Sequence, residues 1–84
     1  MTPTKKLEVM AYQTQQAQRH LDEEKYDSAA IWVCSIENTA IRWGPPEIKA
    51  LCTKAWQQIK DGDYEGAAET LDEIEDLLDE LLET

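Results

Sequence analysis

The residues of this chain that could do chemistry are mainly carboxylates, and in the last segment their spacing is regular. Residues 61–84 carry eleven Asp or Glu and no Lys or Arg, whereas residues 1–60 carry seven acids and all eight basic side chains. The net charge of −10 therefore belongs to the C-terminal part of the chain. Seven of these acids recur every three or four residues, which aligns side chains along one side of an α-helix. They are Glu69, Asp72, Glu73, Asp76, Asp79, Glu80 and Glu83.

This acidic row has two interpretations. On a helix it would be roughly 20 Å long, and like charges at this spacing destabilise an isolated helix by a few tenths of a kcal/mol per pair. A basic partner would offset that cost, so one hypothesis is docking to a Lys/Arg-rich protein surface, including one that normally holds nucleic acid. The alternative is a solvated face that keeps a small protein soluble. The negative charge argues against direct binding to nucleic acid or to anionic membranes.

Other chemical signals are weak. The sequence has no Gly-rich phosphate loop, no nucleophile elbow and no His-Glu-x-x-His motif. Cys34 and Cys52 lie 18 residues apart, and His20 is the single histidine, so neither a metal site nor a cofactor is expected. We expect both cysteines to be small buried residues, with a disulfide as the alternative. The missing motifs predict a protein that is not an enzyme. The N-terminus lacks a signal-peptide pattern and two cysteines fit a reducing compartment, so a cytoplasmic location is predicted.

Hydrophobic periodicity predicts an all-α chain. Residues 26–43 are apolar around nearly the whole helix, which is typical of a buried helix. Gly44 suits the left-handed position after a helix, and the prolines that follow suit a helix start. Trp56 falls on the predicted core stripe of the next helix. The predicted helices span residues 4–23, 26–43, 45–60 and 64–82.

An internal repeat is the most specific signal. When the chain is shifted by 38 residues, Tyr26 aligns with Tyr64 and Ala29-Ala30 aligns with Ala67-Ala68. Further apolar positions align as well: Met10 with Ile48, Ala17 with Ala55, Leu21 with Ile59, Val33 with Leu71 and Ile36 with Ile74. The chain is therefore predicted to be one domain, 1–84, built from two helical hairpins at about 4–43 and 45–83. They could close into a compact four-helix bundle or stack as an open pair.

The second hairpin resembles a known family. Ala55-Trp56 followed by Gly62-Asp63-Tyr64-x-x-Ala67 is similar to the turn and second-helix start of a tetratricopeptide hairpin. The resemblance implies that Tyr64 and Ala67 let two helices pack closely. It also implies protein binding rather than catalysis, by an adaptor or chaperone that holds a peptide in an apolar groove between the first and third helices.

Apolar residues offer another candidate surface. Trp32 and Trp43 lie eleven residues apart and so share a helix face, and Trp is common at the energetic centres of interfaces. Tyr12 and Ile31 lie off the core stripes of their helices and would mark an interface if exposed together. In the last helix an a/d pattern is either part of the core or a dimer seam; it consists of Leu71, Ile74, Leu78 and Leu81.

Three functional hypotheses follow. The first is a protein-binding module whose acidic row blocks a nucleic-acid-binding protein, which by class analogy alone is the mode of phage-encoded inhibitors of host defence. The second is a homodimeric structural or assembly protein that uses apolar helix faces. The third is the tetratricopeptide-like adaptor.

Overall fold

The structure is a computed structural model that describes residues 3–83, except for the side chains of Pro3 and Trp43. It contains four α-helices and, over this range, no strand. The all-α prediction is confirmed, and each helix begins and ends within one residue of the expected position. The helices are α1 (Pro3–Asp22), α2 (Tyr26–Trp43), α3 (Pro46–Asp61) and α4 (Tyr64–Glu83).

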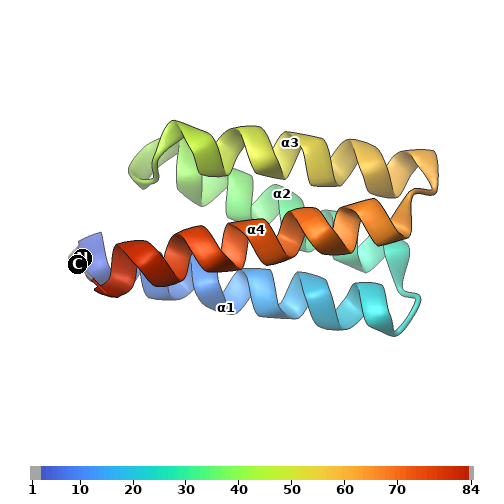
Figure 1. Ribbon diagram of the computed structural model, residues 1–84, viewed down its shortest axis with the longest axis horizontal. Coiled ribbons are helices and arrows are strands. Elements are labelled where there is room, and N and C mark those ends of the chain that lie inside the picture. Colours follow the sequence, from blue (N-terminus) through green and yellow to red (C-terminus); the bar gives the residue numbers. More distant parts are fainter. Residues whose placement is uncertain (1–2, 84) are drawn as a thin grey trace.

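The helices form a closed ring (Figure 1). Each helix packs against the next one in the chain, and α4 returns to pack against α1. Over the described residues, the diagonal pairs α1/α3 and α2/α4 have no Cα atoms within 8 Å of each other. Because the loops hold only two or three residues, neighbouring helices are antiparallel. The two hairpins therefore close into a four-helix bundle instead of an open stack. The prediction of a groove between the first and third helices is wrong, since α1 and α3 lie diagonally opposite in the closed bundle.

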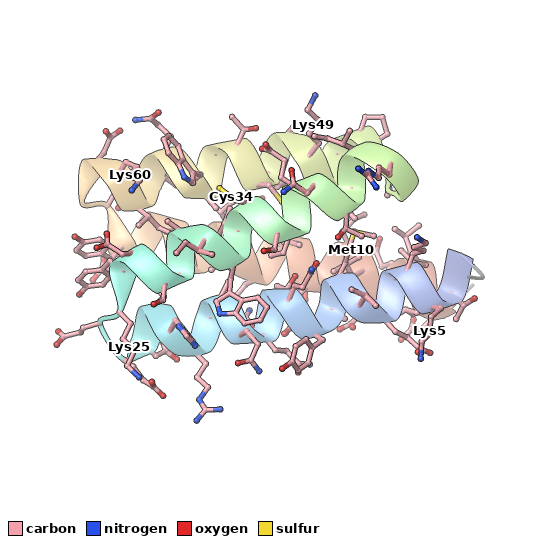
Figure 2. All side chains as sticks on the ribbon, turned by 180° about the vertical axis from the view of Figure 1, so that it is seen from behind. Lys5, Met10, Lys25, Cys34, Lys49 and Lys60 are labelled. Atoms are coloured by element: carbon pink, nitrogen blue, oxygen red, sulfur yellow. The ribbon has the colours of Figure 1, made fainter. Side chains whose placement is uncertain are left out.

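Helix α2 is not the buried helix that its composition suggested. Its outer side faces solvent and carries Ile31, which is 66% exposed, and Ile41, which is 57% exposed. Cys34 is also exposed, and Figure 2 shows it on α2 beside α3. The reason is geometric, because a ring of four helices has no central helix. Each helix is covered by two neighbours and leaves its outer side to water.

The internal repeat corresponds to an approximate twofold axis along the bundle. Exchanging α1 with α3 and α2 with α4 reproduces the ring of contacts. The loop within each hairpin also has the same backbone hydrogen-bond pattern in both copies. The Glu24 and Lys25 amides donate to Leu21 and His20, while the Gly62 and Asp63 amides donate to Ile59 and Gln58. Both are Schellman caps. Glu24 (φ 62°) and Gly62 (φ 83°) occupy the same left-handed position.

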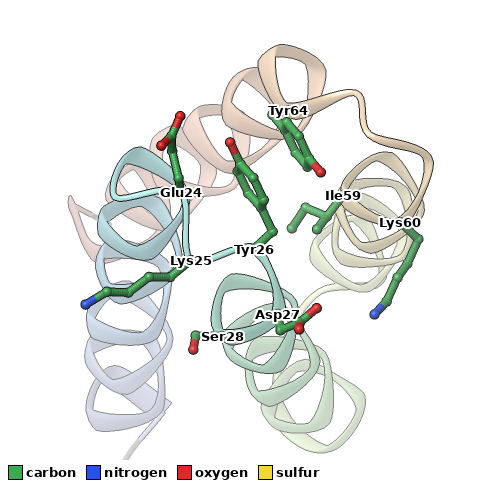
Figure 3. A pocket seen from close by; sticks show the side chains of 8 residues that line it. All are labelled: Glu24, Lys25, Tyr26, Asp27, Ser28, Ile59, Lys60 and Tyr64. Carbon is green, nitrogen blue, oxygen red and sulfur yellow. The ribbon is translucent and has the colours of Figure 1, made fainter.

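Two equivalent tyrosines meet across this axis at one end of the bundle (Figure 3). The rings of Tyr26 and Tyr64 are stacked, with centroids 3.6 Å apart and planes 2° apart. They begin α2 and α4, which have no close backbone contact, so the ring pair links the two helices across the diagonal. The repeat thus places one residue type from each hairpin at a shared position.

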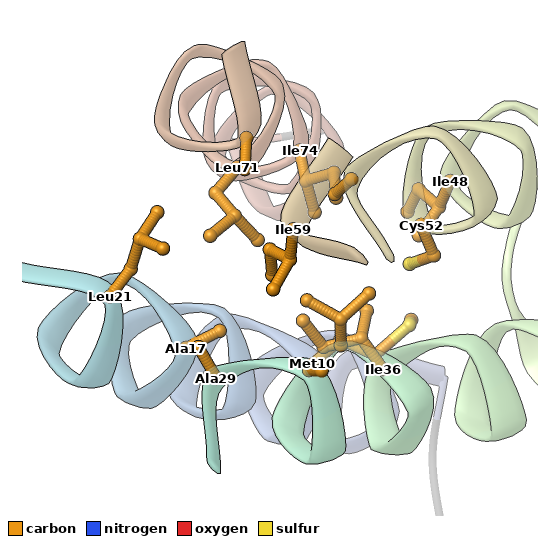
Figure 4. Close-up of a cluster of buried hydrophobic side chains, with 14 of the residues drawn as sticks. Met10, Ala17, Leu21, Ala29, Ile36, Ile48, Cys52, Ile59, Leu71 and Ile74 are labelled. Carbon is orange, nitrogen blue, oxygen red and sulfur yellow. The ribbon is translucent and has the colours of Figure 1, made fainter. Parts of the chain in front are cut away.

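The core lies between the four helices and follows the repeat (Figure 4). Side chains from all four helices meet there without solvent contact, including Met10, Ile36, Ile48 and Ile74. The repeat-matched pairs Met10/Ile48, Ala17/Ala55, Leu21/Ile59, Ala29/Ala67, Val33/Leu71 and Ile36/Ile74 are buried in both hairpins. Of the aligned pair Ala30/Ala68, Ala30 is buried and Ala68 is half-buried against the core.

The role expected for Gly44 is wrong. Its backbone is extended (φ −104°, ψ 168°) and does not adopt the left-handed conformation. A Cβ atom at this position would lie 3.0 Å from Ala40 Cα and 3.2 Å from Ala40 Cβ. Glycine suits this position because the chain passes close to the last turn of α2 as it turns into α3.

Candidate functional site

The seven carboxylates of the acidic row all lie on the solvent side of α4. The opposite side of the same helix carries Leu71, Ile74 and Leu78, which are fully buried in the bundle. Because α4 turns once every 3.6 residues, burying that apolar stripe leaves the acids outside. Each member of the row is exposed: Glu69, Asp72, Glu73, Asp76, Asp79, Glu80 and Glu83. We call this set the acidic face of α4.

The acidic face contacts the neighbouring helix α1 through Asp72. Asp72 Oδ1 accepts a hydrogen bond from Gln18 Nε2 of α1 at 3.0 Å. Arg19 and Lys25 both form ion pairs with Glu23 in the first loop, at 3.2 and 3.0 Å. Hydrogen bonds from these two cations hold the pKa of the Glu23 carboxyl below its usual value. Arg19 and Lys25 are thus engaged with the loop between α1 and α2.

The heptad pattern of α4 belongs to the core. Leu71, Ile74 and Leu78 have no exposed surface, and Leu81 is half-buried against the same cluster. A dimer seam along these residues would require the bundle to open. The core interpretation of the stripe is confirmed.

The candidate apolar interface residues lie in two separate places. Tyr12 is 56% exposed on α1 and contacts Trp32 edge-on, with ring centroids 6.1 Å apart. His20 approaches Trp32 in the same way at 6.2 Å. Trp32 is therefore half-buried between α1 and α2, while Ile31 faces α3. The side chain of Trp43 lies outside the described part of the structure.

A groove between α2 and α3 brings together residues that the sequence did not group. Trp56, placed on the core stripe by periodicity, is 37% exposed, and its ring lines the groove opposite Ile31 and Cys34. Two adjoining hollows of about 280 and 210 Å³ share Cys34 and Trp56. Lys60 Nζ lies 5.5 Å from the Trp56 ring centroid. The signal that could have found this groove is the repeat, because Trp56 aligns with the polar Gln18.

The two cysteines differ in environment, and both are free. Cys52 is buried, and burial raises the pKa of its thiol to about 12, with smaller contributions from Glu37 and Cys34. Cys34 is exposed, so the expectation that both cysteines are buried is wrong for this residue. Its position on the outer side of α2 explains the difference.

A third hollow, of about 440 Å³, lies at the end of the bundle beside the tyrosine pair (Figure 3). Charged side chains of the first loop and of α3 surround it, including Glu24, Lys25 and Lys60.

Over residues 3–83, no three His, Cys, Asp or Glu side chains are grouped so that they could hold a metal ion. In the same range, no helix is both long enough and apolar enough to cross a membrane.

Comparison of the chain with protein-family models, with curated proteins and with solved structures finds no match.

Proposed function

We propose that this protein is a non-enzymatic binding module that docks onto a basic protein surface through the acidic face of α4. The observation that carries this proposal is the exposure of seven carboxylates along one side of a single helix. The last turn of α4 contains no basic residue, although carboxylates there oppose the negative end of the helix dipole. An external cation would relieve both this conflict and the repulsion within the row.

The charge density of the row favours a particular kind of partner. Seven carboxylates over about 21 Å of helix give about one charge per 3 Å. One strand of B-DNA carries about one phosphate per 3.4 Å. A protein surface shaped to hold a phosphate strand is thus matched in charge spacing by the acidic face. The proposed activity is inhibition of a nucleic-acid-binding protein by occupation of that surface.

Neither cysteine is paired, which is compatible with the cytoplasm as the proposed location.

The test compares capture of partners by two charge-reversed variants. The first carries Asp72→Lys, Asp76→Lys and Glu80→Lys on the acidic face. The control carries Glu8→Lys, Asp22→Lys and Asp61→Lys, which reverses the same number of exposed acids on α1 and α3. Each tagged chain is used to capture proteins from lysate at low and high salt, with quantification by mass spectrometry.

We expect partners of the unmodified chain to be released by salt, to be displaced by added nucleic acid, and to persist with the control variant. They should be lost with the acidic-face variant while circular dichroism shows an intact helical fold. Equal capture by the acidic-face variant would show that α4 is not the contact.

A further inference from the structure

The internal repeat supplies a comparison between two equivalent surfaces of the same molecule. Under the twofold exchange, the outer side of α2 corresponds to the outer side of α4, and α3 corresponds to α1. Gln18 of α1 bonds Asp72 of α4, and at the equivalent places Trp56 of α3 and Cys34 of α2 line one groove. The two surfaces therefore share a backbone geometry and differ in their side chains.

The difference in side chains is systematic. Ile31, Cys34 and Ile41 of α2 stand where α4 has Glu69, Asp72 and Asp79. Because the same position in the second hairpin accepts a carboxylate, the fold does not require an apolar residue there. Single exposed apolar side chains are ordinary, but here Ile31, Cys34 and Trp56 line one groove. The exposed Ile41 follows Cys34 by seven residues, which places it two helical turns along the same side of α2. We call these four residues the apolar face.

The charge of the α2–α3 side indicates that a second copy of the chain can contact it. Helices α2 and α3 carry four acids and four Lys or Arg, so their charges cancel, whereas α4 carries nine acids and no base. Two copies of a chain with net charge −10 repel each other at every approach that brings their α4 helices together. Contact through the neutral α2–α3 side keeps both acidic faces away from the interface.

We propose that the apolar face is the interface of a twofold homodimer. In such a dimer the same patch of each copy meets itself, and the mixed charges around the groove, such as Asp27 and Lys60, can pair between copies. The molecule exposes 5147 Å². A stable dimer that buries ~800 Å² per partner would cover about a sixth of this surface. The dimer presents two acidic faces and does not depend on what they bind.

The test measures mass by sedimentation equilibrium over a range of protein concentrations. The unmodified chain is expected at twice its mass of 9.6 kDa, and added salt should not dissociate it, because the contact is apolar and salt screens the remaining repulsion. The variant with Ile31→Glu and Ile41→Asp carries the residues that α4 has at the equivalent positions. We expect its dissociation constant to rise at least ~100-fold, because each copy brings both new charges into the interface.

The matched control adds two charges at exposed positions of α1, by Thr4→Glu and Gln15→Glu, and should remain dimeric. A second readout is the alkylation rate of Cys34, which should fall as the unmodified protein is concentrated; Cys52 is buried and does not compete. The proposal is overturned by a single-chain mass throughout, by a dimer that persists in the Ile31/Ile41 variant, or by equal dissociation of the control.

Discussion

At the scale of single residues, the loop that joins the two helices of each hairpin shows which features the repeat keeps and which it changes. Glu24 and Gly62 have the same left-handed backbone and the same pair of cap hydrogen bonds. An L-residue with a side chain adopts this conformation at a cost of about 1 kcal/mol, and glycine adopts it freely. Since a Cβ atom at Gly62 would meet no atom within 4 Å, the cost at this position comes from the backbone angle alone.

The prediction at this scale concerns those two positions. Glu24→Gly should raise the free energy of unfolding by about 0.5 kcal/mol, the relief of strain being partly offset by the greater freedom of glycine in the unfolded chain. Gly62→Ala should lower it by about 1 kcal/mol. Urea denaturation followed by circular dichroism measures both changes. A destabilised Glu24→Gly variant would mean that the Glu24 side chain makes a contribution larger than its strain.

At the scale of helices, α4 differs from the other three in its end charges. The last turns of α1, α2 and α3 contain Arg or Lys, which favours a helix C-terminus, and α4 has none. Its stability therefore comes from the buried stripe centred on Leu71, Ile74 and Leu78. An arrangement that costs stability on the surface of one helix is the kind of feature that selection for binding can maintain.

The prediction for this element is that Glu80→Lys stabilises the bundle by about 1 kcal/mol. A Lys at this position removes repulsion with the neighbouring carboxylates and complements the negative end of the helix dipole. The same substitution at Asp27, in the first turn of α2, should destabilise the protein by a comparable amount. Chemical denaturation of the two variants gives the comparison. If both shift stability in the same direction, net charge and not helix position is responsible. Binding of the proposed partner should weaken for Glu80→Lys despite the added stability.

At the scale of the whole molecule, charge is divided between two halves of the ring. The α2–α3 half is neutral, and nine of the acids lie on α4. Ring closure brings α4 against α1, where Gln18 supplies a neutral donor to Asp72. The α4 carboxylates repel one another in the folded state, and added ions can screen that repulsion.

The prediction for the whole molecule is that added salt stabilises it. The free energy of unfolding should rise by on the order of 1 kcal/mol between low and high ionic strength, because screening weakens the repulsion more in the compact state than in the unfolded chain. The variant with Asp72→Lys, Asp76→Lys and Glu80→Lys should show a smaller rise. Denaturation midpoints at several ionic strengths test this; stability that falls with salt would contradict the predicted repulsion.

Much of this architecture is local and follows from the sequence. A helix that buries one side must repeat apolar residues at its own period, so helix positions, the core stripe of α4 and the outward acids could be predicted. The repeat of 38 residues likewise identified the core pairs and the two tyrosines. These features depend on spacing within one helix or on similarity between two segments.

Only the tertiary structure decided which apolar residues remain outside. Cys34 and Ile41 belong to a helix whose composition suggested burial, and periodicity placed Trp56 on a core stripe, yet all three face solvent. Periodicity gives the direction of an apolar arc around a helix, but the width that is covered depends on how many neighbours pack against it. Closure of the ring by α1 and α4 fixed that number at two for every helix and left the α2–α3 groove open to water.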